Sequence, residues 1–369
     1  MADHRIYWLA LNLVLGDNLG PAQRVAERFA PLEEAFRAGT AALRNLGLSA
    51  AQAARLSSAS TLDQAARDLE RAEKKGIALL LREDADYPPD LREIYDPPPL
   101  LMCAGRADAL SRPGVAVVGS RRPSPYGRAV AERLARDLAG RGLVVTSGLA
   151  LGIDAAAHWG ALRGGRTVAV LGSGLNVPYP KENRKLMETI VAGGGAVVSE
   201  FALDAQPLAF HFPLRNRVIS GLSRALVVVE AARRSGSLIS ARLALEQNRE
   251  VMAVPGNVTS ELSAGTNALI QAGAKLVRDW TDVAAELPPP LRDELLAAAA
   301  ETGGGDDRPQ PGPESARVLA LLREDALAGV DELVERTGCS VSEILTALLD
   351  LELKGWVAAH PGQRFQRRP

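Results

Sequence analysis

Two adjacent arginines follow an apolar segment at a position that phosphate-binding folds use. Val115–Gly119 is apolar, and Ser120, Arg121 and Arg122 come directly after it. In doubly wound α/β proteins such a segment is a strand, and the loop that follows it binds phosphate at the carboxyl edge of the sheet. A dinucleotide site would carry glycines here, so that the backbone reaches the pyrophosphate. Paired guanidinium groups instead predict a ligand with exposed phosphates, and nucleic acid is the largest such ligand.

Similar loops follow the later apolar segments. They are Ser147–Asp154, which contains Gly148, Tyr179–Asn183 and Arg233–Ser237, together with Phe212–Arg217, which leads into a helix before the fifth strand. One glycine loop carries little information, since any tight turn uses glycine. Four glycine-rich or basic loops at equivalent positions predict an anion channel, because the carboxyl ends of parallel strands meet at one edge of the sheet.

Aromatic residues lie in or near the same loops, where they could stack unpaired bases. They are Tyr126, Tyr179, Phe201, Phe210 and Phe212. An aromatic side chain beside a loop is also a common packing anchor, so both interpretations stay open. The mixture of aromatic and basic residues favours a single strand over a duplex.

A catalytic interpretation has weaker support. Asp154 and His158 are four residues apart on one predicted helix, and with Glu200 they could form an acid/base cluster. We prefer a structural role for His158, because no Ser-His-Asp arrangement, metal-binding set or Walker lysine accompanies it. We therefore expect no catalytic residue, no metal and no cofactor.

The basic charge is concentrated in the middle of the chain. The whole chain has a net charge of -1, but residues 115–280 contain 20 Lys and Arg against 12 Asp and Glu, whereas residues 281–369 contain 9 against 16. A basic central region is the electrostatic footprint expected of a polyanion-binding domain. A solvated basic surface is the alternative, because the count does not say which face carries the charge.

The remaining composition indicates a cytoplasmic protein. Cys103 and Cys339 fit neither a metal-ligand pair nor a disulfide framework, so we expect them to be small core residues in a reducing compartment. The apolar segment Ile6–Leu15 contains Asn12 and no small-residue cleavage site follows it. No segment is long enough to span a membrane, and we expect no membrane partner.

The basic loops need a sheet to position them. Six short apolar segments lack internal alternation, which is typical of strands buried on both faces of a parallel sheet between helices. We predict these strands at 115–119, 143–147, 167–171, 196–199, 225–229 and 250–254. Ile77–Leu81 and Leu100–Cys103 are predicted to be two further short strands. The fold class is thus α/β, with an extended, Rossmann-like, doubly wound parallel sheet.

Smaller units flank this core. Residues 1–75 have helical periodicity, which predicts a helical domain resembling sterile-alpha-motif or helix-hairpin-helix bundles. The core is predicted to span 76–284, a flexible linker rich in Gly, Pro and Asp to span 285–314, and a winged-helix-like domain to span 315–369.

The predicted recognition helix of the winged helix, Val341–Leu353, contains three acidic residues and no Lys or Arg. DNA phosphates would repel such a helix, so contact with a protein or a regulatory role is the better interpretation. Arg364, Arg367 and Arg368 in the tail leave a smaller DNA-binding option open.

The loop series resembles the DprA/Smf family of bacterial DNA-processing proteins. The matching segments span roughly residues 77–283 and are Gly119–Arg121 with Ser124, Tyr126 and Gly127, Ser147–His158, Tyr179–Asn183, Phe212–Ser223, Ser235–Ala241, Ala253–Gly256 and Gly265–Ala274. Two positions depart from the family pattern: Ala202 stands where proline is usual, and Ser240 stands where threonine is usual.

The resemblance implies a core that binds single-stranded DNA, forms a homodimer, and helps to load the RecA recombinase during natural transformation, without enzymatic turnover. It assigns DNA contact to Arg121 and Lys181, and Arg215, Asn216 and Arg217 match the family's Arg-Asn-Arg motif. Together with the loop pattern, it gives the DNA-binding candidates Gly119, Ser120, Arg121, Arg122, Gly148, Lys181, Asn183, Arg215, Asn216, Arg217, Ser235 and Ser237. A Rossmann-like nucleotide-processing hydrolase is the main alternative, and a winged-helix regulator is a third.

Overall fold

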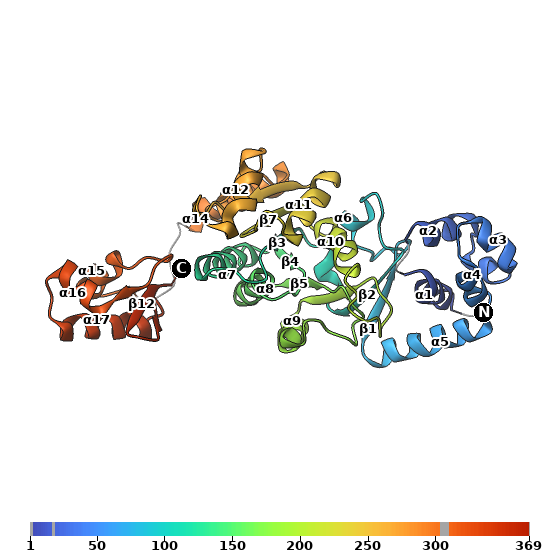
Figure 1. Cartoon of the computed structure of the whole chain (residues 1–369), viewed down its shortest axis with the longest axis horizontal. Coiled ribbons are helices and arrows are strands. Elements are labelled where there is room, and N and C mark those ends of the chain that lie inside the picture. The colour runs from blue at the N-terminus through green and yellow to red at the C-terminus, as the bar shows by residue number, and fades with distance from the viewer. Residues whose placement is uncertain (1–2, 17–18, 303–309, 369) are drawn as a thin grey trace.

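Three units follow one another along an elongated molecule (Figure 1). The computed structural model describes residues 3–16, 19–302 and 310–368. A group of helices lies at one end, a domain with a large sheet lies in the middle, and a small α/β unit lies at the other end. Within the described ranges, no helix combines the length and the apolar character needed to cross a membrane.

The N-terminal unit is helical, as predicted. Its elements are α1 (His4–Leu15), α2 (Leu19–Arg28), η1 (Leu32–Phe36), α3 (Gly39–Asn45), α4 (Ala50–Leu56) and α5 (Ala59–Lys74). Ser49 begins α4 with a capping box, in which its hydroxyl accepts from the Gln52 backbone and the Gln52 side chain accepts from the Ser49 backbone. Leu11, Leu43 and Leu56 fill the centre of the unit.

The central sheet has nine strands in the order β1-β2-β6-β5-β4-β3-β7-β8-β9. They are β1 (Ile77–Leu81), β2 (Leu100–Gly105), β3 (Gly114–Val118), β4 (Val144–Ser147), β5 (Thr167–Val170), β6 (Ala196–Ser199), β7 (Ala225–Val228), β8 (Glu250–Ala253) and β9 (Lys275–Leu276). The pairs β1·β2 and β2·β6 are antiparallel, and all other pairs are parallel. The six predicted parallel strands are confirmed to within one residue at each end. The sequence analysis missed β9, because two residues are too short to produce a periodic pattern.

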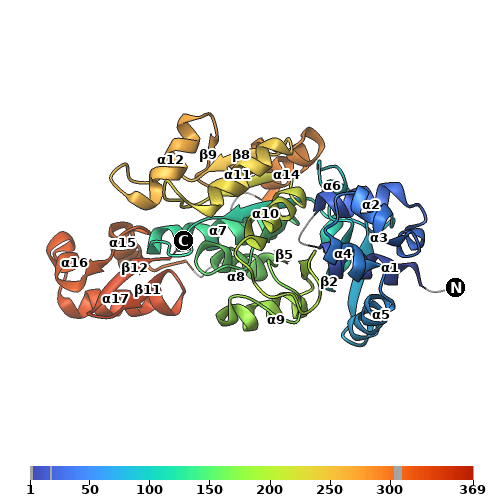
Figure 2. The ribbon, with the colours of Figure 1, turned by 45° about the vertical axis from the view of Figure 1, so that its right-hand side comes forward.

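Helices cover both faces of this sheet (Figures 1 and 2). Val115 and Val117 of β3 pack on the face with α7 (Pro125–Ala139), α8 (Ile153–Gly164), α13 (Trp280–Ala285) and α14 (Pro289–Thr302). Ala116 and Val118 face the other side, which is covered by α6 (Pro89–Arg92), α10 (His211–Gly221), α11 (Gly236–Glu246) and α12 (Ala264–Gln271). Helix α9 (Arg184–Ala192) packs near β6 together with α1 and α5. The short helices are η2 (Ala107–Ser111), η3 (Lys181–Asn183) and η4 (Glu261–Ser263).

The strand order defines where a ligand crevice should form. Strands β4, β5 and β6 follow β3 on one side, and the chain then crosses back so that β7 pairs with the other side of β3. This reversal is a topological switch point, and in open α/β sheets ligands bind beyond the carboxyl ends of the strands at such a point. The Ser120–Ser124 loop leaves β3 at that place.

The C-terminal unit has the three helices and terminal hairpin predicted for a winged helix. Its elements are α15 (Pro313–Leu321), β10 (Ala328–Gly329), α16 (Val330–Thr337), α17 (Val341–Leu353), β11 (Val357–His360) and β12 (Arg364–Arg367), with the strand order β10-β12-β11. Leu333, Leu348 and Leu351 are buried at its centre. The exposed side of α17 carries Leu345, Leu349 and Leu353.

Part of the range predicted to be a linker is folded. Helix α14 begins at Pro289, and its Leu295 is buried in the same cluster as Leu134 of α7. Proline at the start and a run of alanines favour a helix, so the small side chains that suggested a linker are compatible with packing. Residues 303–309 of the predicted linker lie outside the described residues.

Candidate nucleic-acid interface

The loop after β3 presents two exposed arginines at the switch point. The Ser120 N–H donates to the Glu230 carbonyl at 2.7 Å, so this loop is tied to the end of β7. Arg121 and Arg122 are exposed. The Arg121 guanidinium lies 5.5 Å from the ring centroid of Phe212, within range of a cation–π contact. Gly119 sits where a Cβ would approach Ile153 to 2.8 Å, so the glycine is needed for packing.

Glu230 organises this loop, and the sequence analysis missed it. Its buried carboxylate accepts from the Ser124 N–H at 2.9 Å and from the Ser124 hydroxyl. The Ser124 hydroxyl in turn accepts from the Gly127 N–H and begins α7. A Cβ at Gly127 would lie 2.3 Å from the Glu230 carboxyl carbon. The only signal in the sequence is an acidic residue just after an apolar strand, which is too common to assign a role.

The loop after β4 is held from inside the protein. The Asp154 carboxylate accepts from the N–H groups of Gly148 and Ala150, at 3.1 Å and 3.3 Å. Leu149 has a φ of 57° and Gly152 a φ of 83°, so the backbone turns sharply between the strand and α8. Gly148 itself is buried. It therefore shapes the loop and exposes little surface of its own.

Arg215 is buried beneath that loop. Its guanidinium donates to the carbonyl of Gly148 at 2.7 Å and to the carbonyl of Val170. Burial lowers the pKa of Arg215 to about 10, and the nearby Asp154 carboxylate opposes this shift. Arg215 is 4% exposed. It joins the ends of β4 and β5, and only a small part of it reaches the surface.

Arg217 faces the interior, and Asn216 is half-buried. The Arg217 guanidinium pairs with the buried Glu200 carboxylate, and its Nε lies 3.2 Å from Oδ2 of Asp96. Burial raises the pKa of Glu200, and the Arg217 charge opposes that shift. The Arg-Asn-Arg segment thus points two charged residues into the fold.

The loop after β5 separates two roles that the sequence did not distinguish. Lys181 is exposed. Asn183 is buried, and its Nδ2 donates to the carbonyls of Leu149 and Ala150, at 2.8 Å and 3.1 Å. Asn183 therefore joins this loop to the loop after β4, and Lys181 is left to face solvent beside it.

A small hollow joins these loops at the surface. It has a volume of about 50 Å³ and is lined by Arg121, Gly148, Ala150, Leu151, Tyr179, Pro180, Phe212 and Arg215. Tyr179 and Phe212 are tilted against each other with ring centroids 5.6 Å apart, and Tyr179 is 42% exposed. Arg121 comes from the loop after β3, Tyr179 from the loop after β5, and Phe212 from the first turn of α10. These residues form one rim at the edge of the sheet.

The aromatic candidates divide into packing anchors and surface groups. Phe201 is buried and stacks on His211, and the Tyr126 hydroxyl donates to the Pro255 carbonyl at 3.2 Å, so these two support the fold. Phe210 is 50% exposed. Tyr179, Phe210 and Phe212 are thus the rings that could contact a base.

The loop after β7 contributes a helix N-terminus. The Ser235 hydroxyl accepts from the Ser237 N–H at 3.3 Å and begins α11, whereas Ser237 is buried. Arg233 and Arg234 are exposed just before this helix. Strands β3 and β7 are neighbours, so this loop leaves the sheet beside the Arg121 loop.

The three residues of the possible acid/base cluster have separate structural roles. Asp154 bonds to backbone N–H groups, Glu200 pairs with Arg217, and the His158 Nδ1 lies 2.7 Å from the Thr167 hydroxyl. All three are buried. This agrees with the structural interpretation of His158.

His158 is expected to make stability depend on pH. Burial lowers its pKa to about 3, from 6.5. Between these values the unfolded chain binds a proton that the folded chain does not, so the free energy of unfolding falls as the pH falls. We expect His158 to account for a loss of about 2 kcal/mol between about pH 7.5 and pH 5. Urea denaturation of the wild type and of His158→Gln at both pH values measures this loss.

The difference between the pH profiles of the wild type and of His158→Gln reports His158 alone. Buried acids such as Glu200 change the free energy of unfolding in the opposite direction as the pH falls, but they do so in both proteins. Parallel profiles for the wild type and His158→Gln would contradict the assignment.

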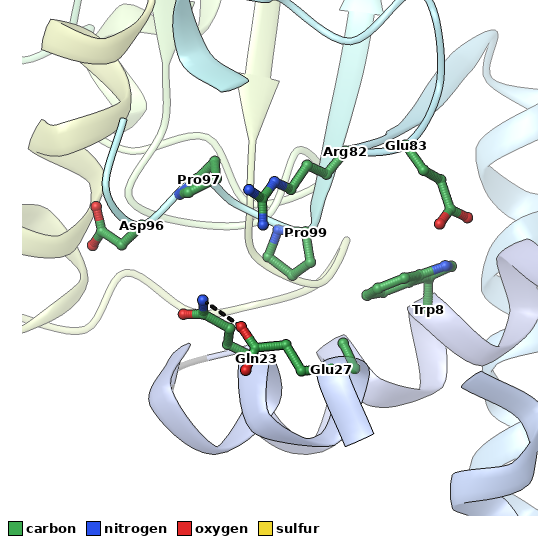
Figure 3. Close-up of a pocket in the computed structure, with 9 residues that line it drawn as sticks. Trp8, Gln23, Glu27, Arg82, Glu83, Asp96, Pro97 and Pro99 are labelled. Carbon is green, nitrogen blue, oxygen red and sulfur yellow. Dashed lines mark hydrogen bonds between the residues drawn. The ribbon is translucent and has the colours of Figure 1, made fainter. Parts of the chain in front are cut away.

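A larger hollow lies between the N-terminal helices and the core (Figure 3). It has a volume of about 330 Å³, and its charged lining residues are Arg82, Glu27, Glu83 and Asp96. Trp8 and Gln23 complete the helical side. Three carboxylates against one guanidinium make this hollow unsuitable for a polyanion.

Comparisons with known proteins identify the family. A family model described as DNA recombination-mediator protein A matches residues 78–288, which is more than half of the chain. The chain belongs to that family. The DNA recombination-mediator protein A match contains the four loops and the α10 segment described above, and a second model, the DprA winged helix domain, matches residues 305–363. The resemblance stated from the sequence motifs is thus confirmed.

Individual relatives of the DNA recombination-mediator protein A family agree. Protein Smf of Escherichia coli (strain K12) is 46% identical over 281 residues, which cover 75% of this chain and 74% of the relative. The structure of DNA processing protein A (DprA) from Streptococcus pneumoniae matches with a TM-score of 0.64 and 38% identity, over 77% of this chain and 98% of that one. DNA processing protein A from Helicobacter pylori, described for its single-stranded DNA binding mode, matches with a TM-score of 0.51 and 30% identity, over 61% and 96% of the two chains.

Proposed function

We propose that this protein binds single-stranded DNA along the carboxyl edge of its sheet and acts as a recombination mediator. The observation that carries the proposal is the exposed Arg121 guanidinium, which stands over Phe212 beside the exposed Tyr179 ring. A cation next to one exposed and one half-buried ring offers phosphate contact and base stacking at one place. Membership of the recombination-mediator family and the single-strand binding of the Helicobacter pylori relative support the same function.

The predicted site residues then divide by role. Arg121, Arg122 and Lys181 contact phosphates, and Gly119 and Ser120 form the loop that carries the arginines. Ser235 and the N-terminus of α11 provide a further anion contact. The loops are held in place from inside by Gly148, Asn183, Arg215, Arg217 and Ser237. Asn216 is half-buried and so is intermediate between the surface contacts and these internal residues.

Two further partners belong to the proposal. The family resemblance implies that the protein loads RecA onto the strand and that it forms a homodimer through the core. The exposed edge strand β9, with Leu276 43% exposed, and Leu245 of α11, 60% exposed, support self-association of the core. Sedimentation equilibrium measures the dimer directly, and RecA filament formation on coated single strands measures loading.

A titration with oligonucleotides tests the function. We expect the protein to bind single-stranded DNA more tightly than a duplex of the same length. The logarithm of the binding constant should fall with the logarithm of salt concentration, with a slope of roughly -0.7 per phosphate neutralised. Fluorescence anisotropy at two salt concentrations measures both properties. Binding that does not respond to salt would exclude this mode of recognition.

The same protein preparation tests the hydrolase alternative. Incubation with nucleoside monophosphates, followed by chromatography for released base, would detect multiple turnovers. We expect none, because the buried acids described above bond within the fold. Steady release of base would show that the protein is a nucleotide-processing enzyme and would contradict the mediator function.

A further inference from the structure

A cleft lined by arginines lies between the core and the winged-helix unit. Both views place β12 near α7 (Figures 1 and 2), and residues of α7, α8, β11 and β12 line the cleft. The cleft has a volume of about 670 Å³. Its charged lining residues are Arg128, Glu132, Arg133, Arg136, Arg163, Arg367 and Arg368, together with His360. Six guanidinium groups face one lining carboxylate, which is a strong excess of positive charge for one cleft.

Half of these arginines have carboxylate partners. Arg163 pairs with Glu132, Arg136 with Asp137, and Arg133 with Glu324. For Arg128, Arg367 and Arg368 the described part of the chain supplies no ion pair. Nε2 of His360 is also buried without a hydrogen-bond partner among the described residues. The cleft therefore keeps three cations, one from α7 and two from the C-terminal tail, that are available to a ligand.

The two walls of the cleft are tied together. Nη1 of Arg133 on α7 lies 2.8 Å from Oε2 of Glu324, which precedes β10. The Gln366 side chain on β12 donates to the Glu324 carbonyl at 2.7 Å. Arg133 also donates to the Arg278 carbonyl at 3.2 Å. Glu324 thus joins the hairpin of the winged helix to the core and holds the cleft in shape.

The cleft continues the rim described above. Arg121 lines the hollow with Tyr179 and Phe212, whereas Pro123 and Pro125, two and four residues later, line the cleft. The segment that carries Arg121, Pro123 and Pro125 therefore forms part of the wall of both the hollow and the cleft. A strand that crosses this loop from the rim therefore reaches the cleft.

We propose that the cleft binds the sugar–phosphate backbone of the same single-stranded DNA, as a continuation of the path from the rim. This rests on the proposed function. The lining offers guanidinium groups and, except for His360, no ring on which a base could stack, so the contact is with phosphates and independent of sequence. The winged helix then uses its tail and hairpin on DNA, whereas no residue of α17 is among the lining residues of the cleft.

Binding of short and long oligothymidylates tests the proposal. The short probe, of about 6 nucleotides, should occupy only the rim, and the long probe, of about 20 nucleotides, should occupy rim and cleft. The double variant Arg367→Glu/Arg368→Glu should weaken binding of the long probe by about tenfold and leave binding of the short probe unchanged. The salt slope for the long probe should become less steep by about 1.4, for two phosphates lost.

Matched variants complete the test. Arg128→Glu, on the opposite wall, should have the same selective effect, and Arg367→Gln/Arg368→Gln should lose less affinity than the reversal. Arg317→Glu on α15, an exposed arginine outside the cleft, should change nothing. Thermal melting confirms that each variant is folded.

Three results would overturn the inference. They are an unchanged affinity for the long probe, an equal loss of affinity for both probes, and a loss of affinity confined to a duplex probe. If the wild type binds neither single-stranded probe, the proposed function fails as well, whereas unchanged binding in all cleft variants removes only the cleft.

Discussion

Arg121→Glu is expected to weaken the binding of single-stranded DNA by at least about tenfold. Arg121 is exposed, has its guanidinium over the Phe212 ring and lines the hollow at the switch point of the sheet. The substitution removes one phosphate contact and places a carboxylate against the strand, so repulsion adds to the lost attraction. The salt slope should become less steep by about 0.7. Fluorescence anisotropy with a labelled oligothymidylate measures both changes.

Arg112→Glu is the matched control. Arg112 is also exposed, but it precedes β3 and therefore lies at the amino edge of the same sheet, opposite Arg121. The two variants have the same net charge, so any difference between them reports position. Equal losses in the two variants would show that binding depends on overall charge and not on this rim.

Arg217→Met is expected to lower the free energy of unfolding by about 3 to 5 kcal/mol. Arg217 and Glu200 are each 4% exposed and pair in the interior. Removing the guanidinium leaves the Glu200 carboxylate buried without its cation, and this loss costs more than the pair contributes. Urea denaturation measures the change. In the folded variant, affinity for single-stranded DNA should stay close to that of the wild type.

Two further variants separate the role of the ion pair from loss of packing. Arg217→Met/Glu200→Gln removes the unpaired charge as well and should recover part of the stability. Arg242→Met removes a 73% exposed arginine paired with Glu246 on α11, and should cost at most about 0.5 kcal/mol. A stable Arg217→Met protein that no longer binds DNA would instead make Arg217 a contact residue.

The strands and the rim could be predicted from the sequence because both are local patterns. Each apolar segment such as Val115–Gly119 is buried on both faces, and this leaves a run without alternation. Parallel strands bring their carboxyl ends to one edge, so the loops with Arg121 and Lys181 had to meet. The ordered motifs were also specific enough to indicate the family before any fold was known.

The direction of each side chain depended on the tertiary structure. Arg121 and Arg215 are both arginines of predicted basic segments, yet Arg121 is exposed in a loop, whereas Arg215 lies in α10 and bonds to the carbonyls of Gly148, just after β4, and Val170, in β5. Those carbonyls lie 67 and 45 residues away in the chain, so no local pattern records the contact. The same reason hid Glu230 and the cleft between α7 and β12.

The sequence by itself therefore determined the sheet, the edge that carries the basic loops, the family and the winged helix. Only the tertiary structure decided which cations are free for a ligand, because pairing with a buried carboxylate such as Glu200 depends on residues distant in the chain. The tertiary structure also decided that α14 packs against the core. Burial of Leu295 stabilises this helix there, although its segment has few large side chains.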